Sequence, residues 1–65
     1  MKYFIIPQSI ADALGITAYR YGNAADGYLV NIGDLAVYGM EKALSEGARE
    51  VSEREATEFV NKNMR

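Results

Sequence analysis

The chain is 65 residues long, carries a net charge of −2 and contains neither cysteine nor histidine. Without thiols it forms no disulfide and no thiolate metal site, and without imidazoles its three serines lack the usual base that would activate them as nucleophiles. We therefore expect one domain over residues 1–65, no cofactor and no enzymatic activity. The net negative charge also argues against a surface that binds nucleic acids through an excess of lysine and arginine.

The first predicted element is a strand at the sequence KYFII. The aromatic and β-branched residues of Lys2–Ile6 predict a strand that is buried on both faces, and Pro7 ends it. A short helix follows. We expect Ser9 to cap it, with Asp12 three residues on in the spacing of a capping box, and Gly15 to end it in the left-handed conformation.

The segments ITAYRY and YLVNI are strand-like and flank the loop GNAADG, which predicts a β-hairpin. Tyr19 and Tyr21 are expected on one face of the first strand and Tyr28 on one face of the second, where cross-strand pairs stabilise a hairpin. Asn23 and Asp26 are typical turn residues. They supply too few oxygens for a calcium loop, and the glycine spacing does not fit a phosphate-binding loop, so we expect no metal site here.

A longer helix is predicted after Asp34, which can cap it, and Gly47 ends it. The apolar residues that recur at helical spacing in it are Ala36, Val37, Met40, Ala43 and Leu44. Gly39 lies inside this helix at a cost of about 1 kcal/mol relative to alanine. It marks either a close approach by another element or an ordinary imperfection.

The segment at residues 48–52 is either a short strand or an extended linker. Ser52 and Glu55 then have the spacing of a capping box and predict the start of the last helix. The residues of this helix that are expected to face the core are Ala56, Phe59, Val60 and Met64.

The predicted element order is β-α-β-β-α-(β)-α. It indicates an α+β fold in which helices cover one face of a small, mostly antiparallel sheet. The longest uncharged run, Tyr3 to Ala11, has nine residues, far fewer than the roughly 20 that span a bilayer. We therefore expect no membrane partner and a cytoplasmic location.

The segment IADALGI, at residues 10–16, resembles the first helix and turn of helix-turn-helix and excisionase-like DNA-binding proteins. This resemblance implies that a recognition helix with outward polar and basic residues should follow. The residues that do follow alternate like a strand and include one basic residue, Arg20. A nucleic-acid-binding accessory protein is therefore the alternative function, with Arg20, Tyr19 and Tyr21 as its first candidate contacts.

Charge is unevenly distributed along the chain. Residues 1–33 carry four charged side chains and residues 34–65 carry twelve, whereas four of the five tyrosines lie in the first half. Interfaces are enriched in tyrosine and depleted in lysine and glutamate, and so short a chain buries little surface by itself. We therefore predict a protein-interaction module that is a homodimer, paired through the sheet edge or the hairpin face, with a further protein partner that is unknown. The candidate interface residues are Tyr19, Arg20, Tyr21, Tyr28 and Tyr38.

Overall fold

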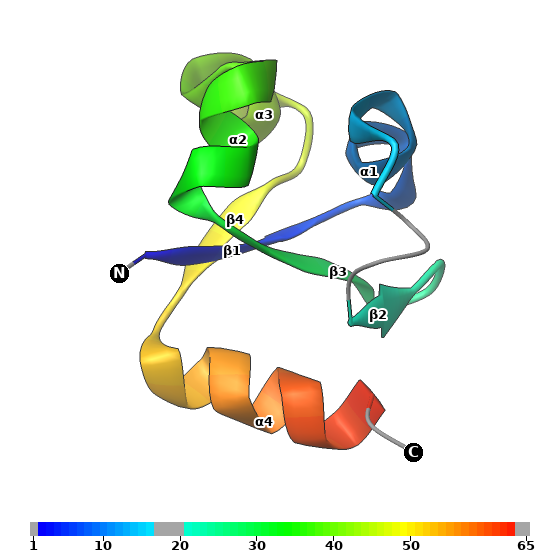
Figure 1. Cartoon of the computed structure of the whole chain (residues 1–65), viewed down its shortest axis with the longest axis vertical. Coiled ribbons are helices and arrows are strands. Elements are labelled where there is room, and N and C mark those ends of the chain that lie inside the picture. The colour runs from blue at the N-terminus through cyan, green and yellow to red at the C-terminus, as the bar shows by residue number, and fades with distance from the viewer. Residues whose placement is uncertain (1, 17–20, 64–65) are drawn as a thin grey trace.

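The computed structural model describes residues 2–16 and 21–63, which form a small sheet with helices packed against it (Figure 1). The elements in chain order are β1 (Tyr3–Ile6), α1 (Gln8–Leu14), β2 (Gly22–Asn23), β3 (Gly27–Asn31), α2 (Ile32–Tyr38), α3 (Met40–Ser45), β4 (Arg49–Val51) and α4 (Glu53–Asn63). The predicted α+β class is confirmed. Residues 48–52, for which the sequence allowed either a short strand or an extended linker, contain the strand β4.

The sheet is antiparallel throughout, in the order β2-β3-β1-β4. β1 lies in the middle, where Phe4 is opposite Val30 of β3 on one side and Glu50 of β4 on the other. β2 pairs with β3 at the hairpin turn, with Gly22 opposite Tyr28. β4 is therefore an edge strand of the described sheet.

Helices pack on both faces of the sheet. α1, α2 and α3 lie on one face and α4 lies on the other (Figure 1). Because successive strand side chains point to opposite faces, Phe4 and Ile6 share a cluster with Leu35 of α2, whereas Ile5 shares one with Ala56 of α4. This arrangement corrects the expectation that helices cover one face only. A central strand that is apolar on both sides requires an apolar cover on both.

The core has two parts that the sheet separates. The larger part, toward α1, α2 and α3, contains Phe4, Ile6, Ile10, Ala11, Tyr28, Val30, Leu35, Ala43 and Ala48. The smaller part, toward α4, contains Ile5, Leu29, Val51 and Ala56, with Tyr3, Phe59 and Val60 packed against it. The predicted inward side of the last helix is thus confirmed for Ala56, Phe59 and Val60, and Met64 lies outside the described residues.

α1 begins at Gln8, directly after Pro7. The carbonyl of Pro7 accepts hydrogen bonds from the N–H groups of Ile10 and Ala11, each at 3.1 Å. Pro7 occupies the cap position and Ser9 lies inside the helix, so the predicted capping role of Ser9 is wrong. The predicted end is confirmed, because Gly15 has a φ of 70° in the left-handed region.

The helix predicted after Asp34 is in fact two helices. α2 begins at Ile32 because the Asp34 N–H donates to Asn31 Oδ1 at 3.0 Å and the Asn31 N–H donates to Asp34 Oδ2 at 3.3 Å. Asn31 is therefore the cap and Asp34 is the third helical residue. Gly39 separates α2 from α3, because its φ of 109° and ψ of 114° are not helical. Residues with a Cβ rarely adopt this conformation, which explains why a glycine stands at the break.

α4 begins where the capping signal predicts. The Glu55 N–H donates to Ser52 Oγ at 3.1 Å, which confirms the cap at Ser52. Arg49 Nη1 of β4 lies 3.4 Å from Glu55 Oε2 and so links the edge strand to the first turn of the helix. No helix in residues 2–16 or 21–63 is long and apolar enough to cross a membrane.

Candidate interaction surface

The outward side of α2 is apolar. Its exposed residues are Ile32, Gly33, Ala36 and Val37, which we call the α2 face. Val37 is 82% exposed and Ile32 is 42% exposed, whereas Leu35 on the inner side is fully buried. The four positions share one side of the helix because residues four apart lie above one another. The outward side of a surface helix usually carries charged or polar residues, so α2 presents more apolar surface than is usual for such a helix.

A shallow hollow adjoins the α2 face. Leu14 and Ile16, at the end of α1, line it together with Asp34 and Val37 of α2. The turn that ends α1 places Ile16 there, with the Ile16 N–H donating to the carbonyl of Ala11 at 3.1 Å. Leu14 and Ile16 also pack against the larger core, which fixes their position. An exposed apolar side chain and a largely apolar hollow therefore lie side by side.

Tyr38 lies at the C-terminal end of α2 and is half-buried. Its hydroxyl donates a hydrogen bond to a carboxylate oxygen of Glu46, and Lys42 Nζ lies 4.7 Å from the centre of its ring. The hydrogen bond to Glu46 raises the pKa of Tyr38 above its usual value, and desolvation and the negative charge of Glu46 act in the same direction. Charged groups thus border the α2 face at this end.

The predicted interface residues occupy different environments. Tyr38 lies at the end of the α2 face, and Tyr21 is 48% exposed on the hairpin. Tyr28 is only 7% exposed and packs in the larger core, so it does not present its ring to a partner. Tyr19 and Arg20 lie outside the described residues.

The sequence prediction missed the α2 face because it placed Val37 in the same helical stripe as Ala43. That stripe assumes one continuous helix. The break at Gly39 changes the phase, so that Ala43 is buried in α3 while Val37 faces outward from α2. The signal that could have revealed the face is the reciprocal pair Asn31–Asp34, which starts the helix earlier and puts Leu35 inside.

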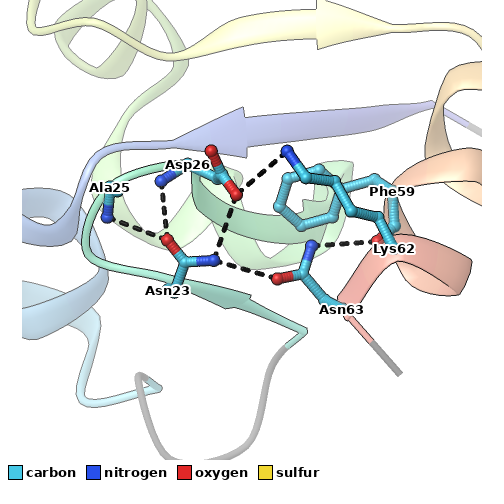
Figure 2. Close-up of polar contacts among 6 residues, drawn as sticks. All are labelled: Asn23, Ala25, Asp26, Phe59, Lys62 and Asn63. Carbon is cyan, nitrogen blue, oxygen red and sulfur yellow. Dashed lines mark hydrogen bonds and ion pairs between the residues drawn. The ribbon is translucent and has the colours of Figure 1, made fainter. Parts of the chain in front are cut away.

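A polar cluster joins the hairpin turn to the end of α4 (Figure 2). Asn23 Oδ1 accepts hydrogen bonds from the N–H groups of Ala25 and Asp26 at 2.9 and 2.8 Å, which closes the turn. Asn23 Nδ2 donates to Asp26 Oδ2 at 3.1 Å and to Asn63 Oδ1 at 3.0 Å. Lys62 Nζ lies 3.1 Å from the same Asp26 oxygen. We call Asn23, Asp26, Lys62 and Asn63 the hairpin clasp.

The hairpin clasp gives the polar residues of the loop a structural role. The hydrogen bond from Asn23, followed by the hydrogen bond and positive charge of Lys62, lowers the pKa of Asp26 below its usual value. Asn63 Nδ2 also donates to the carbonyl of Phe59 at 3.0 Å, which anchors the Asn63 amide in α4 (Figure 2). Within the described ranges, no group of three or more acidic side chains is arranged to hold a metal ion.

Comparison with protein-family models, with curated proteins and with solved structures gives no match for this chain.

Proposed function

We propose that the protein is a small non-enzymatic module that acts by protein–protein contact, and that the α2 face is its contact surface. The observation that carries this proposal is the 82% exposure of Val37 within a face that has no charged side chain. The centres of protein interfaces are depleted in charged residues. Single exposed apolar residues are common, but an uncharged helix face beside a largely apolar hollow forms a patch, and patches mark interaction sites.

The sheet edge is a weaker candidate than the α2 face. β4 has three residues, and two of them, Arg49 and Glu50, are charged and exposed. Short, charged edge strands are a common means of preventing further strand pairing. Both side chains are also paired within the chain, Arg49 with Glu55 at 3.4 Å and Glu50 with Lys2 at 3.8 Å. We therefore place the contact on α2 rather than on β4.

Nucleic-acid binding, the alternative function, finds less support than protein contact. Phosphate binding depends on clustered lysine and arginine side chains. In the described part of the chain, Lys2, Arg49 and Lys62 each lie within 3.8 Å of a carboxylate oxygen, and Lys42 lies over the ring of Tyr38. A phosphate would have to compete with these partners for four of the five described cations, and the fifth, Arg54 on α4, is a single charge and not a cluster.

Site-specific photo-crosslinking in the cells that make the protein tests the proposal. A photoreactive residue at position 37 should give a discrete protein adduct, because Val37 is the more exposed of the two large apolar side chains of the α2 face. The matched control is the same residue at position 61 of α4, where Asn61 is exposed and outside the α2 face. Adducts of equal yield at both positions, or none at position 37, would contradict a contact surface on α2.

A further inference from the structure

We infer that α4 is a strap that opens as a separate unit, detaching from the sheet while the strands and the helices on the other face stay folded. This opening is independent of the proposed function, because α4 and the α2 face belong to opposite faces of the sheet (Figure 1). Three features of α4 support it: a small contact with the sheet, a hollow on each side of that contact, and exposed polar attachments at both ends.

The contact between α4 and the sheet is small. Within Glu53–Asn63, Ala56 is the one buried residue, and Phe59 and Val60 are half-buried. The largest fully buried side chains of the described chain lie instead in the larger core and are Ile6, Ile10 and Leu35. Hydrophobic stabilisation grows with the apolar area removed from water. The strap is therefore held more weakly than the elements of the larger core are held to one another.

A hollow lies on each side of this contact. One hollow, of about 290 Å³, lies between Leu29 of β3 and the side of α4 that carries Glu53. The other, of about 240 Å³, lies between Ile5 of β1 and the side that carries Lys62. Residues nine positions apart point to opposite sides of a helix with 3.6 residues per turn, so the two hollows flank the line of contact. The side chains along this line lack the close neighbours that a packed interior supplies.

The remaining attachments of α4 are polar and exposed. At the first turn Glu55 pairs with Arg49 of β4, and at the last turn the hairpin clasp joins Lys62 to Asp26. Each of these four side chains is 35% exposed or more, and exposed ion pairs contribute little to stability because water and salt screen them. All four strands precede α4 in the chain and pair with one another. The strap can therefore leave without breaking a strand pairing.

A detached α4 also loses its helical structure. It has 11 residues, and helices shorter than about 12 residues are marginal in water by themselves. Opening therefore removes the hydrogen bonds that protect the α4 amides from exchange with solvent. It also uncovers the side chains beneath the strap, which are Ile5, Leu29 and Val51. Local units of this kind open with a smaller free energy than global unfolding requires.

Native-state hydrogen exchange of the full chain, followed by NMR at low urea concentrations, tests the opening. After correction for intrinsic rates, the amides of Phe59 and Val60 should exchange at least about tenfold faster than the slowest amides of β1 and β3. Their exchange should also depend less on urea, because opening the strap exposes less surface than global unfolding does. Equal protection and equal urea dependence in α4 and β1 would overturn the inference.

A variant in the larger core separates an independent opening from a global one. Ile10 is fully buried in the larger core, and Ile10→Val keeps a β-branched apolar side chain, so this variant should fold. It destabilises the closed chain and the chain with an open strap equally. It should therefore speed the exchange of the β1 amides about two- to tenfold and leave that of the α4 amides unchanged. Equal acceleration of both sets would mean that α4 opens only with the whole fold, which overturns the inference.

The hairpin clasp sets how often the strap opens. Lys62→Met removes the ion pair with Asp26 and keeps an unbranched apolar stem, and it should speed the exchange of the α4 amides about two- to fivefold. The matched control is Lys42→Met, which removes the same charge from α3 on the other face of the sheet. It should leave the α4 amides unchanged. The same response of the α4 amides to both variants would contradict the clasp as the attachment that holds the strap.

Discussion

Leu35 and Val37 lie two residues apart on α2, and Leu35 is fully buried whereas Val37 is 82% exposed. The helix therefore turns one apolar residue into the larger core and another toward the outside. This contrast separates the role of α2 in the fold from its proposed role in contact, because a substitution at Val37 should change the contact surface and leave the fold intact.

The first prediction compares these two positions. Leu35→Ala should lower the free energy of unfolding by about 2–5 kcal/mol, since it leaves a cavity in the core, and this is enough to unfold a marginal domain. Val37→Ala, measured where the chain is monomeric, should change it by no more than about 0.5 kcal/mol. Urea unfolding followed by circular dichroism measures both. Equal losses at the two positions would contradict the outward placement of Val37.

The second prediction concerns the break at Gly39. Gly39→Ala should lower the free energy of unfolding by about 1–3 kcal/mol, because residue 39 has a φ of 109°. If a single helix ran through this position, the same substitution would instead raise it by about 1 kcal/mol. The sign of the change in a urea titration therefore decides between a break and a continuous helix.

The third prediction concerns the loss of folding stability as the pH falls. The pKa of Asp26 is lowered in the folded chain, so its contribution to stability is present above the usual value of 3.8 and is lost as the pH falls through the folded value. Asp26→Asn should be less stable than the parent at neutral pH, and the difference should shrink in acid. In Lys62→Met the pKa of Asp26 should rise toward 3.8, as measured by NMR titration of its carboxyl carbon. An Asp26 that titrates identically with and without Lys62 would argue against the hairpin clasp.

The fourth prediction concerns the ionisation of Tyr38 and the loss of folding stability as the pH rises. The hydrogen bond to Glu46 raises the pKa of Tyr38, so this contribution is present below the usual value of 10.0 and is lost as the pH rises through the folded value. Ultraviolet titration should show a late-ionising tyrosine that disappears in Tyr38→Phe. Glu46→Gln should lower the pKa of Tyr38 toward 10.0. An unchanged titration in Glu46→Gln would mean that the two side chains are not paired in solution.

Elements with a strong local cause could be predicted from the sequence. The strand at Tyr3–Ile6, the left-handed end at Gly15 and the cap at Ser52 each depend on a few adjacent residues. Ser9 was predicted wrongly because Pro7 already occupies the cap position and offers its carbonyl to the first turn.

The placement of α4 and the side of α2 that faces outward depend on the tertiary arrangement. The inward stripe of α4 was identified correctly, but the stripe itself carries no information about which face of the sheet it covers. The face of α2 depends on the Asn31 cap and the break at Gly39, which together set the helical phase. Tyr28 could be assigned to a strand from sequence, yet only the packing of α1 and α2 over the sheet shows that its ring is buried.

The most direct test of the central claim is a titration of the full chain with the protein that photo-crosslinking at position 37 captures, followed residue by residue in ¹⁵N–¹H NMR spectra. If the α2 face is the contact surface, the amide signals of Ile32, Gly33, Ala36 and Val37 should shift, together with that of Ile16 beside the hollow, and those of α4 should stay in place. Spectra that do not change, or changes confined to β4 or the hairpin, would contradict it.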